Sequence, residues 1–246
     1  MKRLDSQLKT DFPLAEVTVI KLGGKALSEE KRKNILIKQI VAVGRKLPVV
    51  LVHGGGPEVT KTLEKLGIRT KFVGGLRYTD AKIMELVEMV LSGKVNKDLV
   101  SKINLFGGKA VGLSGKDGSP PLVLAKRIKM LGLVGEPKSV NTDLLEIFLK
   151  RRIIPVVASV ACDLRGKSLN INADTFASAI ASVLKAKRLI FLTNTPGVIG
   201  ENRKPIPTIR IKEIPELIKN KIVSEGMIPK LKSSLEAIRK NVGEVI

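Results

Sequence analysis

A glycine-rich stretch that could bind an anion follows an apolar segment early in this chain. Residues 48–52 form a β-branched apolar run that leads directly into His53-Gly54-Gly55-Gly56-Pro57, and a helical pattern comes next. Glycine permits a sharp turn and lets backbone N–H groups approach a ligand closely. The helix would then direct the positive end of its dipole at the loop. The loop is therefore a candidate anion site, although a strand-to-helix turn of this kind can also be purely structural.

Two lysines could stabilise negative charge. Lys21 directly follows an apolar strand pattern, where an ammonium group is costly to bury unless it meets an anion. The alternative is a lysine whose long stem reaches solvent. Lys230 follows Pro229, and proline suits a first helical position. A cation in that turn opposes the helix dipole, so its position becomes favourable if a phosphate binds there.

Other polar residues have both a chemical and a structural interpretation. Arg77 follows two glycines and could hold a carboxylate through two hydrogen bonds, or form a surface ion pair. Asn170 and Asp174 precede or open a helix and could cap it. We interpret His53 as a core histidine bonded to the backbone rather than as a general base, and Cys162 as a small buried residue.

The composition narrows the class of protein. The chain has 246 residues, 43% of them hydrophobic, which suffices for one large α/β unit or two joined lobes. Its 44 Lys and Arg against 23 Asp and Glu give a net charge of +21, which favours an anionic ligand or partner. The basic residues are dispersed and aromatic residues make up only 3%, so we predict no specific nucleic-acid binding.

Further classes are excluded by what the chain lacks. A single cysteine and a single histidine rule out an intrachain disulfide and argue against a His/Cys metal site. No apolar run reaches the length of a membrane span, and the N-terminus has no signal-peptide core. We therefore expect no membrane association and a cytoplasmic location.

The elements that must position these residues alternate between strand and helix. A strand at 17–20 ends in a glycine-containing turn, and the next helix places Leu36, Ile40 and Val43 on one face. The strand at 48–52 repeats this order. Such alternation predicts an α/β fold with a parallel sheet and right-handed crossovers. Ligands of open α/β sheets bind at the carboxyl ends of the strands, where the candidate residues would converge.

The rest of the chain continues the pattern. We predict helices that flank an interruption at Ser92-Gly93, and the best candidate boundary between two lobes at Gly166-Lys167-Ser168. The stretch 70–79 reads as irregular. The remaining predictions are a strand at 110–113, a hairpin-like excursion at 119–135, a helix at 142–150, buried strands at 153–160 and 189–192, and helices near 213–219 and from 229 onward.

The motifs, taken together and in order, resemble the N-acetylglutamate kinase family of the amino-acid kinase superfamily, from about residue 17 to the end of the chain. The glycine loop alone is a weak signal, whereas the ordered set is a strong one. The other motifs that carry the resemblance are Lys21-Leu22-Gly23-Gly24, Gly75-Leu76-Arg77-Tyr78-Thr79-Asp80, Val87-Glu88-Met89-Val90, Gly93-Lys94-Val95-Asn96-Lys97, Gly112-Leu113-Ser114-Gly115-Lys116-Asp117-Gly118, Asn170-Ile171-Asn172-Ala173-Asp174, Leu192-Thr193-Asn194 and Gly226-Met227-Ile228-Pro229-Lys230.

This resemblance implies a three-layer αβα sandwich around a mainly parallel open sheet. It implies an amino-acid-binding and dimerisation lobe at 1–165 and a nucleotide-binding lobe at 166–246. The implied reaction is phosphorylation of the side-chain carboxylate of N-acetyl-L-glutamate by ATP, a step of arginine biosynthesis. The implied cofactors are ATP and Mg²⁺, with Mg²⁺ held mainly by the ATP phosphates, and the implied assembly is a homodimer.

The resemblance also implies a role for each matching residue. Lys21 and Lys230 would stabilise charge on the transferring phosphoryl group, and Asp174 would hold both lysines. The acceptor amino acid would be bound by Gly55, Gly56, Arg77 and Asn170. The nucleotide would be bound by Gly23, Gly24, Asn194, Gly197, Gly226 and Met227. The chemistry is consistent, because a glutamate carboxylate with a reference pKa of about 4.3 is already ionised at pH 7 and needs no general base.

Two alternatives compete with this interpretation. Tyr78, Thr195-Pro196 and the charge of +21 favour a sister kinase whose aminoadipate or glutamate substrate is attached to an acidic amino-group carrier protein. The other alternative is a non-catalytic amino-acid-binding regulatory protein. Asn194 stands where the family usually has an aspartate, and the chain stops before the family's last strands. Because arginine-sensitive relatives use that C-terminal region and a longer N-terminal helix, we expect little inhibition by arginine.

Overall fold

The central element of the fold is a six-stranded sheet in which every neighbouring pair is parallel. The computed structural model describes residues 13–23, 29–193, 197–199, 204–220, 223 and 227–246. The strands lie in the order β12 (Glu244–Val245), β11 (Arg188–Leu192), β1 (Thr18–Leu22), β2 (Val49–His53), β8 (Ile154–Ala158) and β5 (Ala110–Ser114).

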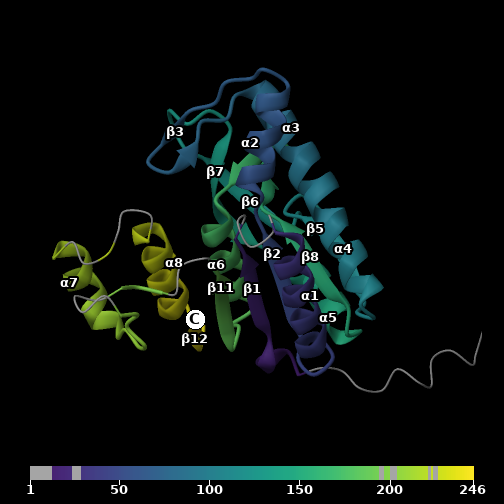
Figure 1. Ribbon diagram of the computed structural model, residues 1–246, viewed down its shortest axis with the longest axis vertical. Helices are drawn as coiled ribbons and strands as arrows, with labels where there is room; N and C mark the ends of the chain where they lie inside the picture. The colour runs from purple at the N-terminus through teal and green to yellow at the C-terminus, as the bar shows by residue number, and fades with distance from the viewer. Residues whose placement is uncertain (1–12, 24–28, 194–196, 200–203, 221–222, 224–226) are drawn as a thin grey trace, which may run out of the picture.

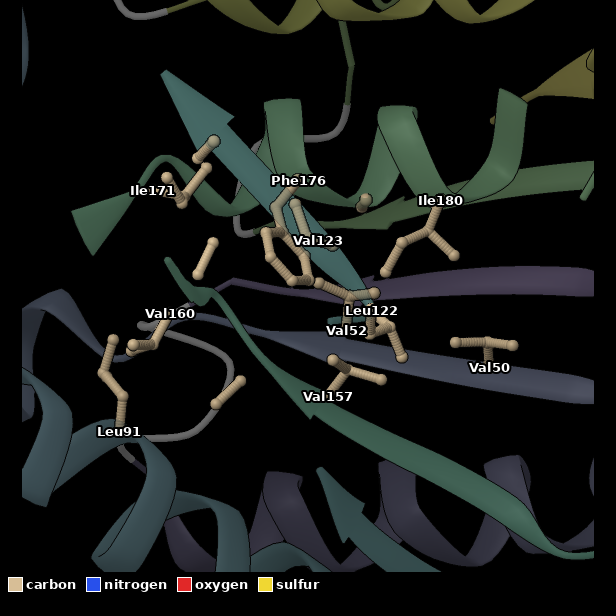
Figure 2. Close-up of a cluster of buried hydrophobic side chains, with 14 of the residues drawn as sticks. Val50, Val52, Leu91, Leu122, Val123, Val157, Val160, Ile171, Phe176 and Ile180 are labelled. Carbon is tan, nitrogen blue, oxygen red and sulfur yellow. The ribbon is translucent and has the colours of Figure 1, made fainter. Parts of the chain in front are cut away.

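Helices cover both faces of this sheet and form the predicted three layers (Figure 1). On one face, α1 (Glu30–Gly44) and α4 (Asn96–Leu105) pack on a core that contains Leu51. On the other face, α5 (Asp143–Lys150) and α6 (Ala173–Val183) pack on a core that contains Val50 and Val52. Figure 2 shows Phe176 and Ile180 of α6 directed towards these valines. Successive residues of β2 therefore face opposite layers, as a doubly covered parallel strand requires.

The helix α1 has its buried face in a slightly different register from the predicted one. Ile37, Ile40 and Val41 are buried, whereas Val43 is 37% exposed and Leu36 is only partly buried. The predicted stripe was therefore wrong at Val43. The long apolar run of α1 offers two overlapping stripes, and packing against β1 and α4 selects one of them.

The predicted helix break at Ser92-Gly93 was also wrong. The helix α3 (Ala81–Glu88) continues through a π-helical segment (Met89–Val95) into α4 without interruption. Ser and Gly are weak helix formers, but tertiary packing overrides that preference. Val90 and Leu91 within the π-helical segment are buried. The wider π turn lets apolar faces of both flanking helices reach the core.

A small closed barrel stands beside the sheet. It consists of β6 (Val123–Arg127), β7 (Val134–Val140), β9 (Val160–Cys162) and β10 (Ser168–Ile171). The antiparallel pairing of β6 with β7 confirms the hairpin expected at 119–135. Gly166 lies in the turn between β9 and β10 at φ +76°, and the division into two lobes near this turn stays a prediction.

The remaining elements are short, except for α2 and α8. A small hairpin of β3 (Phe72–Val73) and β4 (Leu76–Arg77) occupies the stretch predicted to be irregular. The helices α2 (Gly56–Lys65), α7 (Ile214–Lys219) and α8 (Ile228–Arg239) agree with the sequence patterns, and short 3-10 helices lie at Leu14–Glu16 and Ile211–Glu213. Figure 1 shows α7 and α8 on the side away from α4. Within the described ranges, no helix is long and apolar enough to cross a bilayer.

Candidate active site

The charged centre of the site lies at the carboxyl end of β1. The sequence pattern placed Lys21 directly after the strand. In the structure β1 runs through Leu22, so Lys21 lies inside the strand. Lys21 lies on the same face of β1 as Val19, which faces the core beneath α6. Its ammonium group therefore points towards the start of α6, where its Nζ lies 2.6 Å from Oδ1 of Asp174. Both residues are only 7% exposed.

A second lysine completes this centre from the other side. Nζ of Lys230, in the first turn of α8, donates to Oδ2 of Asp174 at 3.0 Å. The capping role considered for Asp174 is taken by Asn172, whose Oδ1 accepts from the N–H groups of Asp174 and Thr175 at 2.9 and 3.1 Å. Each carboxylate oxygen of Asp174 can therefore hold one lysine.

The electrostatics keep this centre positive. Burial lowers the pKa of the Lys21 ammonium, and the charge of Asp174 and its hydrogen bond offset part of that effect. Burial would raise the pKa of the Asp174 carboxyl, but the nearby charges of Lys21 and Lys230 outweigh it and hold that pKa below its ordinary value. Two ammonium groups share one carboxylate, so one positive charge is left over for an anion.

A pocket of about 280 Å³ opens beside this centre. Lys21 and Asp174 line it together with all four predicted acceptor-binding residues, Gly55, Gly56, Arg77 and Asn170. Sequence reasoning did not identify Ser159, Asn172 or the apolar wall as parts of the pocket; that wall includes Phe72, Val87, Leu91 and Val134. Val87 and Asn172 stand in motifs that carry the resemblance, but the sequence does not show that these residues meet in one pocket, because the pocket is assembled from separate elements.

The glycine loop forms one wall of the pocket at the start of α2. A side chain at Gly55 would place Cβ 2.6 Å from Leu91 Cδ2, so the π-helical segment packs directly on the backbone here. A Cβ at Gly56 would meet nothing within 4 Å. Gly56 begins α2, whose first N–H groups and dipole favour an anion at this end.

Arg77 is tied to the same loop from β4. Its Nη2 donates to the carbonyl of Gly56 at 3.1 Å and to Oγ1 of Thr60 at 2.6 Å, and its Nη1 donates to Oγ1 of Thr70 at 3.2 Å. The guanidinium also stacks on the Phe72 ring, 4.7 Å from its centroid. The surface ion pair considered from sequence is therefore replaced by a buried, neutral set of partners.

Asn170 lies on β10 and does not cap a helix. Its Nδ2 donates to Oγ1 of Thr79 at 3.1 Å, and that hydroxyl donates to the carbonyl of Arg77 at 2.8 Å. Thr79 is fully buried. This chain of hydrogen bonds links Asn170 to Arg77, so two predicted acceptor-binding residues are held in one network.

The nucleotide side is only partly described. The N–H of Gly23 donates to the carbonyl of Leu192 at 3.0 Å, so this amide already has a partner, and its predicted contact with phosphate stays a prediction. Gly23 lies close to the ammonium group of Lys21: a Cβ added to Gly23 would stand 3.9 Å from the lysine Nζ. Gly197 and Met227 do not line the pocket, and Met227 packs on a small apolar cluster with Val198. The other predicted nucleotide residues, Gly24, Asn194 and Gly226, lie outside the described residues.

His53 and Cys162 have the structural roles expected of them. His53 is fully buried and does not line the pocket. Burial lowers its pKa to about 4, against a smaller opposing effect of the hydrogen bond to Gly54. Cys162 is a buried free cysteine in β9.

The fold and site together define an α/β phosphotransferase class: a doubly covered parallel sheet whose strand ends present a glycine loop, a helix N-terminus and paired lysines to anions. The chain matches the model of the amino acid kinase family over residues 16–246. It belongs to that family.

Curated relatives narrow the comparison within the family. Over 232 residues the chain is 44% identical to the acetylglutamate kinase of Endomicrobium trichonymphae, which covers 94% of this chain and 92% of the relative. It is 43% identical to the acetylglutamate kinase of Rhodopseudomonas palustris strain TIE-1, covering 94% and 82% of the two chains.

Solved structures agree on the fold. The crystal structure of smu.665 from Streptococcus mutans UA159 matches with a TM-score of 0.83 at 33% identity and covers 94% of this chain and 93% of that chain. N-acetylglutamate synthase from Neisseria gonorrhoeae matches with a TM-score of 0.82 at 19% identity, covering 94% of this chain and 54% of that chain. The second match supports the architecture alone.

Proposed function

We propose that this chain transfers the γ-phosphoryl group of ATP to the side-chain carboxylate of N-acetyl-L-glutamate. Its curated relatives are named acetylglutamate kinase, which agrees with this reaction. The observation that carries the proposal is the position of Asp174 between Lys21 and Lys230 at the wall of the pocket. Lys21 lines the pocket, whereas Lys230 reaches Asp174 from α8. A phosphoryl group moving past Asp174 would therefore meet a lysine from each side.

The reaction needs charge neutralisation more than proton transfer. A carboxylate oxygen bonds to the γ-phosphorus while the bond from that phosphorus to the β–γ bridging oxygen breaks, which releases ADP. The carboxylate is already ionised at pH 7. Preorganised positive groups and N–H donors at the transferring phosphoryl group then supply most of the catalysis. Burial of His53 away from the pocket agrees with a reaction that uses no general base.

Acceptor binding is assigned to the other pocket residues. We assign the N–H groups of Gly55 and Gly56 to the carboxylate that receives the phosphoryl group. We assign Arg77 and Asn170 to the remaining polar groups of the amino acid, with the apolar wall along its carbon chain. The Thr79 hydroxyl accepts from Asn170 and donates to the backbone carbonyl of Arg77, and this link between the two residues supports the assignment.

The part of the chain that the structure describes offers little to a metal ion by itself. Among the described residues no group of three or more Asp, Glu, His or Cys could hold a metal, and Asp174 is engaged by two lysines. These residues fit an Mg²⁺ ion carried by the ATP phosphates. Such an ion would supply further positive charge to the phosphates, and Lys21 and Lys230 would add theirs from the protein.

The remaining nucleotide contacts and the assembly belong to the same proposal. We assign the nucleotide to the α8 side of Lys230, near Gly23, Gly197 and Met227, and place the reaction in the cytoplasm. A homodimer through the first lobe is supported by the exposed apolar side chains of Met89 and Leu105, at 61% and 77% exposure, because both stand on helical segments that contact the edge strand β5. Light scattering after size-exclusion chromatography tests it, and a monomeric mass contradicts it.

The test of the activity compares acceptors directly. Purified protein is incubated with Mg-ATP and N-acetyl-L-glutamate, and ADP is measured together with the hydroxamate that forms when hydroxylamine traps the acyl phosphate. We expect both products in equal amounts. Free glutamate, which lacks the acetyl group, serves as the matched acceptor control. Binding of N-acetyl-L-glutamate without turnover would instead support the regulatory alternative.

One observation favours a second candidate. The net charge of +21 suits an acidic amino-group carrier protein, because opposite charge accelerates and stabilises association. The same assay therefore includes aminoadipate or glutamate attached to such a carrier. ADP release only with the carrier-linked substrate would replace the first proposal by this one.

A further inference from the structure

Behind the glycine loop lies a buried polar pair that does not touch the pocket. His53, the last residue of β2, and Asn96, the first residue of α4, are both 0% exposed. Nδ2 of Asn96 lies 3.0 Å from Nε2 of His53, and Nδ1 of His53 lies 2.9 Å from the carbonyl oxygen of Gly54. Buried polar groups are kept where each has a partner, and this pair meets that condition.

These contacts allow one protonation state of the imidazole. A carbonyl oxygen can only accept, so Nδ1 must carry the proton and donate it to Gly54. Nε2 is then the acceptor for the amide of Asn96. The histidine is neutral at physiological pH, since burial lowers its pKa to about 4.

Asn96 is itself fixed from several sides. Its Nδ2 also lies within hydrogen-bond distance of the carbonyls of Val156 on β8 at 2.8 Å and Leu113 on β5 at 3.2 Å, so three acceptors share its two hydrogens. A Cβ on Gly112 would stand only 2.0 Å from its Oδ1, so the strand passes directly against this side chain. Asn96 therefore fixes the position of the histidine relative to β5 and β8.

The consequence for the pocket follows from peptide geometry. In a trans peptide the C=O and the next N–H point in opposite directions. A Gly54 carbonyl held towards the buried His53 turns the N–H of Gly55 the other way, while Gly54 and Gly55 line the pocket and His53 does not. Packing of Leu91 against Gly55 supports the same peptide from the side.

We propose that His53 and Asn96 are positioning residues that hold the Gly54–Gly55 peptide with its N–H facing the acceptor carboxylate. The proposal rests on the function proposed above, because it assigns that N–H to the acceptor. It separates His53 from acid–base chemistry and gives it an indirect role through the backbone.

Two variants of His53 separate the two hydrogen bonds. In His53→Asn the amide nitrogen can replace Nδ1 and still donate to Gly54, whereas in His53→Gln the amide oxygen can replace Nε2 and accept from Asn96 but the donor to Gly54 is lost. We expect His53→Gln to lose about 10²-fold in kcat/KM for the acceptor, the scale of an approximately 1 Å misplacement. We expect His53→Asn to lose much less, and the KM for ATP to stay unchanged in both.

Measurements on the unaltered protein keep the proposal testable if either variant fails to fold. Because the chain has one histidine, its ¹⁵N imidazole signals report the tautomer without overlap. We expect the neutral Nδ1–H form at pH 7, and a shift of the Gly55 amide signal when N-acetyl-L-glutamate is added. An Nε2–H tautomer, an unmoved Gly55 amide, or equal losses in the two folded variants would overturn the proposal. The tautomer does not depend on turnover, so a failure of the proposed reaction is recognised separately.

Discussion

The ammonium group of Lys21 lies 2.6 Å from the carboxylate of Asp174, although Lys21 lies in β1 near the start of the chain and Asp174 lies in the first turn of helix α6. The parallel sheet brings them together, because β1 lies between β2 and β11. Helix α1, which leads from β1 to β2, and helix α6, which precedes β11, cover opposite faces. The connections on the two sides of β1 therefore leave the sheet on opposite faces. Open α/β sheets bind ligands in the crevice at such a point.

Replacement of Lys230 by alanine should lower kcat much more than it changes the KM for the acceptor. Lys230 contacts Asp174 from α8 but does not line the acceptor pocket. Loss of one preorganised charge at the transferring group should cost about 10² to 10³-fold in kcat. Steady-state kinetics with each substrate varied in turn measures it. Lys232→Ala, an exposed neighbour on the same helix, is the control and should behave as wild type.

Replacement of Asp174 by asparagine should change the pH dependence of the reaction. The charge and hydrogen bond of Asp174 raise the pKa of Lys21 against the lowering effects of burial and of Lys230. Without them the pKa of Lys21 falls further, so protonated Lys21 is lost at lower pH. We expect a reduced kcat and an alkaline limb shifted towards lower pH.

The measurement for Asp174 is kcat against pH at saturating substrates. Asp143→Asn, which removes an exposed carboxylate on α5, controls for the change in net charge. An Asp174→Asn profile that is reduced in height but unmoved along the pH axis would contradict the assigned coupling between this carboxylate and Lys21.

Replacement of Arg77 by lysine should weaken acceptor binding although the positive charge remains. The planar guanidinium holds Gly56, Thr60 and Thr70 at once and stacks on Phe72, which an ammonium group cannot do. We expect the KM for the acceptor to rise about tenfold to a hundredfold, the scale of lost charge-assisted hydrogen bonds. The KM for ATP is the internal comparison, and Arg69→Lys at an exposed position is the control. An unchanged acceptor KM would remove Arg77 from the binding site.

The stability of the protein should fall below pH 6.5 because of His53. Its pKa is about 4 in the folded protein and about 6.5 ordinarily. Between these values the unfolded chain binds a proton that the folded protein does not, so the free energy of unfolding decreases as pH falls through this window. The full shift corresponds to about 3 kcal/mol. Urea unfolding at pH 7 and pH 4.5 measures the slope.

A matched variant isolates this contribution of His53 from that of the carboxylates. His53→Gln has no imidazole to titrate, so its stability should decrease less than that of the wild type between the two pH values. Equal decreases in both proteins would show that the histidine is not buried in its neutral form.

Two adjacent glycines should respond differently to alanine. At Gly55 the added Cβ would stand 2.6 Å from Leu91, whereas at Gly56 it would meet nothing within 4 Å. Overpacking of this kind costs about 1–3 kcal/mol, so Gly55→Ala should lower the midpoint of thermal unfolding. Gly56→Ala should leave that midpoint unchanged or raise it slightly, since alanine favours a helix. Equal effects of the two would exclude the packing contact with the π-helical segment.

Much of the architecture could be predicted from the sequence. The apolar runs at β1, β2 and β8 identified buried parallel strands, because that pattern depends on residues close together in the chain. The strand at β11 was located in the same way, but only Leu189 of it is buried, and the single strand predicted at 153–160 is divided between β8 and β9. The glycine loop before α2 and the candidate pair Lys21 and Lys230 were found in the same way. The register and continuity of helices were less predictable, because packing decides them. Val43 is exposed, and the chain stays helical through Ser92-Gly93.

The partners of the site residues were decided by the tertiary structure. The sequence alone determined which residues could carry charge, turn sharply or start a helix. From the sequence, Asp174 was a candidate helix cap, but Asn172 caps the helix. The sequence did not show that the N–H of Gly23 pairs with the carbonyl of Leu192, or that His53 contacts Asn96. Each of these contacts joins groups whose proximity depends on strand order, crossover side and close packing. Those are properties of the whole folded chain, and no local pattern encodes them.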